Sequence, residues 1–424
     1  MLSHFVSFVS KKMIIQGLFA ICLVMNILPI YAHAEYEEPG TLTAADLLKP
    51  EVLKGKHHSV SEQVQNDGMF NHYQVTSSFG TFKAPSTTAL ELLVKELEAI
   101  AAMKEIKTDD TAIASLKQSG ENTVAGVKHL VTKPEETLKG AASGIESLFH
   151  RASETIGSRE TTGAEDSKVQ QLIGFSKSKG EIATKYGVNV YSRNQVLQDE
   201  LDRLGWADYL GGLGVGVATS AIPGVGGIVL TTSGTTRLLN EAINTTPASE
   251  LWVQNRDNLI AMGMDPDTVQ LFLNNQVFSP ALTTVITSAL GSMKDVGNLE
   301  LFLKVSLQAS TPEMARVITE IAVLTAGYHK HIAPLKKVVP MARITRAVGA
   351  EDAVIVILPT DYLIWRDPIT GLSTTLPEKT GGTEPSDKQL WVSGELSSRT
   401  RDELKQAGWQ INTNVRSKLI LSKE

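Results

Sequence analysis

The chain has 424 residues, with 40 Lys and Arg against 46 Asp and Glu, and a formal net charge of −6. This mild acidity, without a large basic block, argues against nucleic acid as a partner. The only cysteine, Cys22, lies near the N-terminus, so disulfides, thiolate nucleophiles and cysteine-ligated metals are excluded from the rest of the chain.

The first residues have the pattern of a signal peptide. Lys11 and Lys12 precede an uncharged run over Met13–Ile30, and Ala32-His33-Ala34 then supplies the small-x-small site that signal peptidases require. An uncleaved membrane anchor is the alternative, because 18 apolar-leaning residues are near the lower limit for a span. We predict a signal peptide over 1–34, cleavage after Ala34, and export to the periplasm, the envelope or the medium.

The predicted mature chain carries 38 basic and 46 acidic residues and begins without clear periodicity. Residues 35–87 mix Pro, Gly, His and Ser, which indicates a loosely structured lead-in with at most a short strand around Tyr73–Phe82. From Thr88 to about Lys107, apolar residues recur at helical spacing and strong helix formers dominate. The sequence therefore predicts a helix there, the first of the amphipathic helices that we expect over 88–160.

A heptad-like stripe follows, in alternating steps of three and four: Val124, Val127, Val131, Leu138, Ala141, Ile145, Leu148 and Ala152. Pro134 interrupts it once. The run from Gly126-Val127 through Lys133-Pro134 and Lys139-Gly140 to Ser143-Gly144-Ile145 resembles short amphipathic segments near the C-termini of bridge-like lipid-transfer proteins, which implies contact with lipid. Packing against the protein or a partner helix is the alternative, because residues 111–160 carry equal numbers of basic and acidic side chains.

A predicted helical body over 168–345 contains the most unusual segment. From Tyr209 to Thr236 there is no charged residue, and eight of the 28 residues are glycine. A glycine-packed helical hairpin buried in protein and a segment inserted in membrane both explain this composition. A phosphate loop does not, because the required glycine spacing and Gly-Lys-Ser/Thr are missing. The packing or membrane candidates are Gly212, Gly216, Pro223, Gly224 and Gly227.

Repeated oxygen-bearing residues before proline predict helix starts in the same body, at Thr246-Pro247, Asp265-Pro266, Ser279-Pro280 and Thr311-Pro312. The side-chain oxygen caps free amides, and proline at the first helical position loses no hydrogen bond. A further helix is expected around Leu299–Gln308. The pattern predicts a compact helical bundle.

After Ala350 the sequence predicts a small α+β domain over 351–424. Residues 353–358 form an apolar run typical of a buried strand, and further strands are expected at 362–365, 390–392 and 409–412. A helix is expected over Thr400–Ala407, where Thr400 and Glu403 fit a capping box.

Candidate chemistry is sparse. Ser397, Ser398, Arg399 and Arg401 at the start of that helix could hold an anion, although exposed capping explains the same residues. His329 and His331 lack further ligands for a metal, and Asp265, Asp267 and Asp361 are loop acids of no set pattern. We find no catalytic motif and predict no catalytic residue, metal or cofactor.

Together these features predict a mainly α fold, namely a multi-helix body with a glycine-rich apolar hairpin or span and a small C-terminal α+β domain. The predicted function is that of an exported, non-catalytic, envelope-associated protein. It would bind a membrane lipid or an envelope protein through its amphipathic and glycine-rich segments. The alternatives are an exported hydrolase whose acidic site is invisible in the sequence and a pore-forming, toxin-like effector. The oligomeric state is not predicted.

Overall fold

The computed structural model describes residues 36–106, 163–209, 237–341, 343–367, 369–374 and 387–420. The predicted signal peptide, the heptad-like stripe and all five candidate positions of the glycine-rich segment lie outside these ranges. Contacts within the chain separate Met1–Glu38 from Pro39–Glu424, and every element named below belongs to the second unit.

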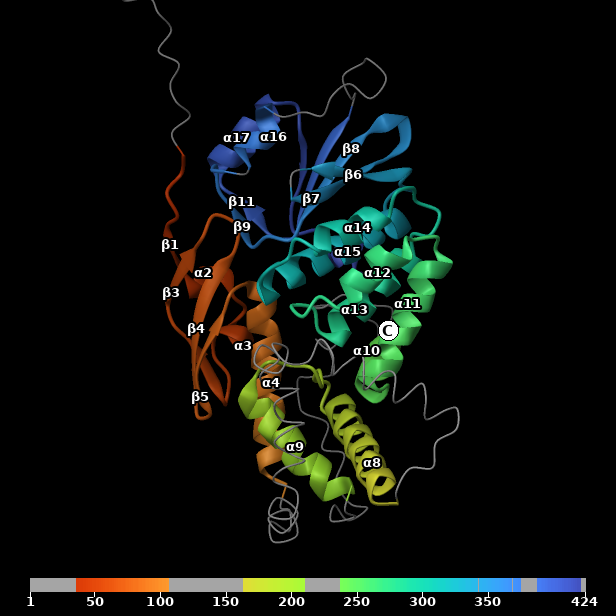
Figure 1. Ribbon diagram of the computed structural model, residues 1–424. Helices are drawn as coiled ribbons and strands as arrows, with labels where there is room; N and C mark the ends of the chain where they lie inside the picture. The colour runs from red at the N-terminus through yellow and green to blue at the C-terminus, as the bar shows by residue number, and fades with distance from the viewer. Residues whose placement is uncertain are drawn as a thin grey trace, which may run out of the picture. The chain divides into compact units, whose positions relative to one another are not determined.

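The first sheet is built from residues 41–84 and is drawn in red to orange in Figure 1. Its elements are β1 (Thr41–Thr43), α2 (Ala44–Leu47), α3 (Pro50–Leu53), β2 (His58–Val60), β3 (Gln63–Asn66), β4 (Asn71–Ser77) and β5 (Gly80–Ala84). In β4, Tyr73 and Val75 are buried while His72, Gln74 and Thr76 are exposed, the alternation of a half-buried strand. The expected loosely structured lead-in is therefore wrong, because these short strands pair with one another in antiparallel register.

Three long helices follow: α4 (Thr87–Lys104), α8 (Gly163–Lys185) and α9 (Gln195–Tyr209). The Ser86 hydroxyl accepts the Ala89 amide (3.1 Å) and so caps α4. Leu90, Leu97 and Ile100 of α4 are fully buried in one cluster with the strands of the first sheet and with α9. The first sheet and the predicted helix thus share one core.

A second cluster holds the helices α10 (Arg237–Thr245), α11 (Ala248–Ala261), α12 (Pro266–Leu273), α13 (Pro280–Gly291), α14 (Glu300–Ser306) and α15 (Pro312–His331). Asp265, Ser279 and Thr311 each cap a helix with the side-chain oxygen, as their position before proline predicts. Thr246 does not, because α11 begins after Pro247, which itself occupies the cap position.

The last part of the described chain is a second sheet, drawn in blue in Figure 1, with its surrounding helices. Its strands follow the order β12 (Gln410–Asn412), β10 (Lys388–Val392), β8 (Val354–Leu358), β7 (Ile344–Val348) and β6 (Lys337–Met341). A short 3₁₀ turn, η2 (Ala350–Asp352), precedes β8, and β9 (Tyr362–Leu363) pairs with β11 (Glu395–Leu396). The helices are α16 (Thr370–Thr374), α17 (Ser398–Gln406) and α18 (Arg416–Leu419).

The two faces of this sheet pack against different partners. Ile355, Ile357 and Trp391 join the core of the α10–α15 helices, where the Trp391 and Tyr328 rings meet edge to face at 5.1 Å. Val354 and Val356 belong to a separate cluster with α16 and α17. The α+β sequence after Ala350 is therefore continuous with β6, β7 and the helical body.

The predicted mainly α fold class is wrong. The described residues contain three sheets, of five, five and two strands, so the fold is mixed α and β. The expected apolar span has no counterpart in the described ranges, where no helix combines the length and apolar character that crossing a membrane requires. The sequence failed here because short strands with polar outer faces give weak signals beside strong helical periodicity.

Candidate functional site

An apolar cavity of about 850 Å³ lies where the first sheet, α4, α15 and the second sheet come together. Apolar side chains from all four dominate its wall, among them Met69, Leu92, Met314, Ile318, Ile344 and Trp409. A cavity of this size and character falls in the range that small-molecule ligands occupy in proteins. The cavity is therefore the leading candidate site in the described part of the chain.

Local sequence explains why the cavity opens at this place. Both helices that border it begin there, α4 behind Pro85 and the Ser86 cap, and α15 at Thr311 and Pro312. On the opposite wall, the antiparallel pairing of β7 and β8 stops at Ala347, which pairs with Ile355. The residues beyond that point on both strands, including Ile344 and Leu358, line the cavity. Two helix starts and a diverging strand pair thus leave space that side chains do not fill.

Arg346 is the most unusual residue of this wall. It sits in the middle of β7, where Val339 of β6 is its backbone partner, and its side chain is only 8% exposed. Its side chain makes no hydrogen bond or ion pair with the described residues, and burial lowers the pKa of its guanidinium. A guanidinium keeps its charge despite such a shift. The cavity wall therefore contains a buried cation without a counter-ion from the described chain.

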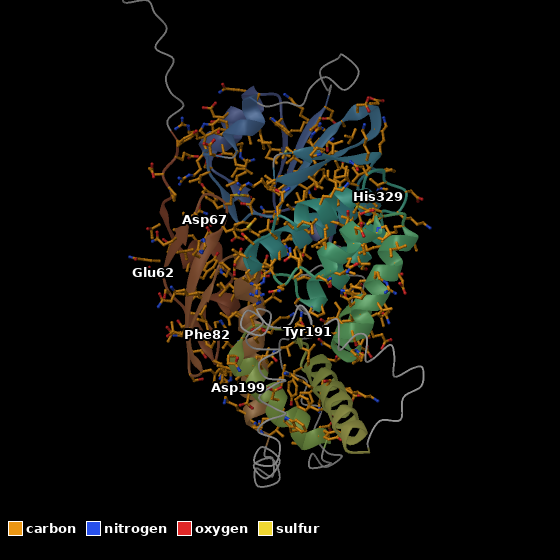
Figure 2. All side chains as sticks on the ribbon, in the orientation of Figure 1. Glu62, Asp67, Phe82, Tyr191, Asp199 and His329 are labelled. Atoms are coloured by element: carbon orange, nitrogen blue, oxygen red, sulfur yellow. The ribbon has the colours of Figure 1, made fainter. Side chains whose placement is uncertain are left out.

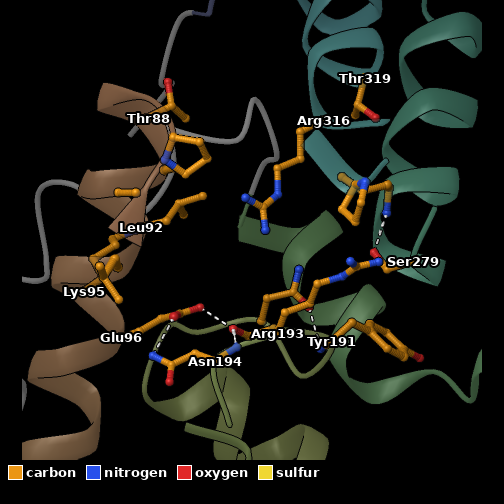
Figure 3. A pocket seen from close by; sticks show the side chains of 18 of the residues that line it. Thr88, Leu92, Lys95, Glu96, Tyr191, Arg193, Asn194, Ser279, Arg316 and Thr319 are labelled. Atoms are coloured by element: carbon orange, nitrogen blue, oxygen red, sulfur yellow. Dashed lines mark hydrogen bonds between the residues drawn. The ribbon is translucent and has the colours of Figure 1, made fainter. Parts of the chain in front are cut away.

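A second, more polar cavity of about 470 Å³ adjoins the first and shares with it Pro85, Thr88, Ala89, Leu92, Glu313, Arg316 and Glu320. In Figure 3 Arg316 extends from α15 into the space that Thr88 and Leu92 of α4 border. Arg316 forms no hydrogen bond or ion pair within the described ranges. It provides a second cation at the junction of the two cavities.

Glu96 of α4 forms the floor of the polar cavity together with the start of α9. Its carboxylate accepts hydrogen bonds from the Ser192 hydroxyl (2.5 Å) and the Asn194 amide group (3.0 Å), drawn as dashed lines in Figure 3. Burial raises the pKa of this carboxyl, while the two hydrogen bonds act in the opposite direction. The Ser192 hydroxyl also accepts the Asn194 backbone amide (3.1 Å), so it is held in a structural bridge between α4 and α9.

An ion pair between Glu320 of α15 and Arg416 of α18 lies in the wall of the polar cavity. Arg416 of α18 also donates to the Thr88 hydroxyl of α4 (2.6 Å), so one guanidinium joins α4, α15 and α18. Burial raises the pKa of Glu320, and the neighbouring Arg416 opposes that rise. Gly327 makes the arrangement possible, because a Cβ there would lie 2.1 Å from the Leu419 carbonyl oxygen of α18.

Asp361 performs a corresponding task at the same end of α4, at its first residue. Its carboxylate accepts the backbone amides of Asn71 (3.0 Å) and Thr87 (2.9 Å), and so ties β9 to both the first sheet and the helix start. Burial raises its pKa, and the two amide hydrogen bonds oppose the shift. Asp67 and His72, whose side chains pair at 2.8 Å, lie nearby on the first sheet at the edge of the apolar cavity; Asp67 is labelled in Figure 2.

The residues singled out from the sequence lie elsewhere or have structural tasks. The Ser397 hydroxyl caps α17 by accepting the Thr400 amide (3.0 Å), and Ser398 is the first residue of that helix. Arg401 pairs with Glu395 (3.1 Å) and Arg399 lies 4.0 Å from Glu403, so carboxylates of the chain already face both cations. This geometry supports capping over anion binding.

The histidine and aspartate candidates also contribute to helix ends. His329 Nδ1 accepts the Leu335 amide (3.0 Å) after the end of α15, and Asp265 caps α12 through Thr268 (2.8 Å). Within the described ranges, no group of three His, Cys, Asp or Glu side chains is placed to hold a metal ion. Sequence reasoning missed Arg346, although an arginine between Ile344 and Val348 in a strand-like alternation was the available signal.

Comparison of the chain with protein-family models, curated proteins and solved structures finds no match. The function must therefore be argued from the geometry of the two cavities.

Proposed function

We propose that the protein is an exported binding protein that holds a lipid-like amphiphile in the apolar cavity. The single observation that carries this proposal is the cavity of about 850 Å³, whose wall is dominated by apolar side chains and which adjoins a polar cavity. An amphiphile has the same division, with a long apolar part and a polar end. The proposed partner is thus a lipid, which is one of the two partners that the sequence predicts, a membrane lipid or an envelope protein.

The size of the cavity is sufficient for useful affinity. Burying an alkyl chain contributes about 0.8 kcal/mol per methylene, so about a dozen methylenes contribute roughly 10 kcal/mol before the costs of association. After an association cost of about 4 kcal/mol, the lower end of the usual range, roughly 6 kcal/mol remains, which corresponds to a dissociation constant of about 40 μM. No comparable gain is available to a small polar ligand in the same space.

Binding explains the buried acids better than catalysis does. Glu96, Glu320 and Asp361 each accept hydrogen bonds from donors of the chain, which hold α4, α15 and the sheets in place around the cavities. General acid–base catalysis requires a carboxyl that reaches a substrate proton. We therefore assign these three carboxyls the role of holding the elements of the cavity walls together.

Cavity filling tests the proposal. Ala89 lies at the junction of the two cavities, and replacing it with phenylalanine places a ring where the ligand would lie. We expect the delipidated mature protein to bind hexadecanol, measured by isothermal titration calorimetry, and Ala89→Phe to abolish that binding. Ala261→Phe, on an exposed position of α11, is the matched control and should bind normally. Hexadecanol binding that is equal in Ala89→Phe and wild type would refute the cavity as the site.

Export is the second part of the proposal, and it rests on the N-terminal pattern. If the signal peptide is cleaved as proposed, the protein recovered from the envelope or the medium begins at Glu35, which mass spectrometry of the intact chain measures directly. Recovery of a chain that retains residues 1–34 in the cytoplasm would refute it. Association through the stripe at 124–152 remains a prediction, because that stripe lies outside the described residues.

A further inference from the structure

We propose that the ligand of the apolar cavity is a single-chain amphiphile with a terminal anion, such as a long-chain carboxylate, and that Arg346 binds this anion. The inference rests on the proposed function, because it names the chemical class of the molecule in the same cavity. The observation behind it is separate from the size of the cavity. It is the isolated, buried guanidinium in the cavity wall.

The burial of the Arg346 guanidinium without a partner calls for a functional explanation. Buried arginines are normally paired, because removing a guanidinium from water without a counter-ion is costly. Arg346 is more than nine-tenths buried, makes no hydrogen bond or ion pair with the described chain, and belongs to the strand end that diverges from β8 and borders the cavity. An anion delivered by a ligand would satisfy this cation. Without one, the fold keeps a destabilising buried charge at a position where an uncharged methionine would avoid the desolvation free energy.

The balance of charge around the cavity favours the same class of ligand. Of the acids on its wall, Asp67 is paired with His72 and Glu320 with Arg416. The third acid, Glu313, and two of the three arginines on the wall, Arg316 and Arg343, are exposed, whereas Arg346 is buried. With Arg416, the partner of Glu320 from α18, four arginines face three carboxylates in the described surroundings of the cavity, and the buried one of them, Arg346, has no partner among the described side chains. A cationic or zwitterionic head would gain less from it than an anionic one.

The shape of the Arg346 guanidinium favours a carboxylate as the anion of the ligand. A guanidinium offers two parallel N–H donors, which match the two oxygens of a carboxylate in a bidentate contact. Apolar side chains dominate the surrounding wall, so the contact would be stronger there than at a fully solvated surface. A carboxylate attached to an alkyl chain meets both requirements in one molecule.

The test compares ligands of equal chain length and different heads. Delipidated mature protein is titrated calorimetrically with palmitate, hexadecanol and acetate, each below its aggregation concentration. We expect palmitate to bind roughly tenfold or more tightly than hexadecanol, since a hydrogen bond between two charged groups is stronger than one between a guanidinium and a neutral hydroxyl. Acetate should not bind measurably, because it lacks the chain. This arm separates recognition of an amphiphile from recognition of a free anion.

Variants identify the residue responsible. Arg346→Met should lower the affinity for palmitate to that for hexadecanol and leave hexadecanol binding unchanged. Arg346→Lys, which keeps the charge but loses the paired donors, should fall between the two. Arg256→Met on α11, which lines neither cavity, is the control and should behave as wild type.

The outcomes separate this inference from the proposed function. Equal binding of palmitate and hexadecanol by the wild type, or an undiminished preference for palmitate in Arg346→Met, would overturn the role of Arg346 and leave a lipid-like ligand in place. Absence of binding by both long-chain compounds would overturn both proposals. The wild-type comparison decides the question even where a variant fails to fold.

Discussion

Arg346 illustrates how a single residue can oppose stability in favour of binding. Its guanidinium is buried and unpaired in the described structure, so the folded protein bears a desolvation penalty that the unfolded chain does not. We predict that Arg346→Met raises the unfolding free energy of the ligand-free protein by roughly 1–3 kcal/mol, because apolar replacement of a buried charge is often stabilising. Urea unfolding measures the change. Arg343→Met, at an exposed position on the same wall, should give no comparable gain.

The hydrogen bonds to Glu96 should stabilise the fold, in contrast to the buried guanidinium of Arg346, so removing one of them should lower the unfolding free energy. Ser192→Ala removes the hydroxyl that donates to the carboxylate at 2.5 Å and leaves Asn194 as its remaining donor from the start of α9. We expect a loss of about 1.5–3 kcal/mol in unfolding free energy at neutral pH, the usual worth of a hydrogen bond to a charged group. A loss below about 0.5 kcal/mol, the size of an ordinary surface substitution, would contradict the proposed bridging role.

At the scale of elements, the close contact of α15 and α18 places Arg416 beside Glu320. Gly327→Ala would put a Cβ at 2.1 Å from the Leu419 carbonyl, so α18 must move, and we expect a loss of roughly 1–3 kcal/mol in unfolding free energy. Gly291→Ala at the end of α13 is the matched control. Beyond its two chain neighbours and the backbone of its own helix, no atom lies within 4 Å of the added carbon. That variant should therefore be neutral or slightly stabilising. Equal effects of the two substitutions would show that α15 and α18 are not in such close contact.

The elements also show which features the sequence could predict. Asp265, Ser279 and Thr311 cap the helices that their position before proline indicates, because capping depends on a few neighbouring residues. The strand at 354–358 coincides with the apolar run at 353–358 that was expected to be buried, and the strand at 388–392 contains the one expected at 390–392. Strands β1 to β3 were missed, and β4 and β5 fall where one short strand was expected around Tyr73–Phe82, because such short strands are stabilised by pairing with one another.

At the scale of the whole molecule, the site could not be read from the sequence because it depends on distant contacts. The Asn66 side chain donates to the Tyr362 carbonyl oxygen across 296 positions (3.1 Å), and Arg416 reaches Thr88 across 328. Such contacts enclose the cavities, yet no local pattern announces them. Arg346 could have been noticed as an arginine in a strand-like alternation, but its isolation becomes visible only when its surroundings are known.

The buried carboxyls give the whole molecule a characteristic pH dependence. Burial raises the pKa of Glu91, Glu96, Glu320 and Asp361 above their ordinary values of 4.5 for Glu and 3.8 for Asp. The folded state therefore binds these protons more tightly, and their contribution to stability is present below the ordinary pKa and is lost as the pH rises through the raised values. We predict that the unfolding free energy falls as the pH is raised above about 4.5.

Glu96→Gln isolates one of these groups, since an amide oxygen can still accept from Ser192 and Asn194 but does not ionise. Its stability should fall less steeply with pH than that of wild type, as followed by urea unfolding at a series of pH values. Glu62→Gln, an exposed position before β3, should give a curve parallel to wild type. Parallel curves for Glu96→Gln and wild type would contradict the raised pKa of Glu96.

The central claim, a lipid-like ligand inside the apolar cavity, is tested most directly by methionine methyl NMR with nitroxide-labelled palmitate. Met69, Met314 and Met341 line the cavity, whereas Met103 and Met293 are fully buried in other parts of the core. We predict strong broadening of the first three methyl signals and little change in the other two. Broadening that spares the three cavity methionines, or that affects all five equally, would contradict the claim.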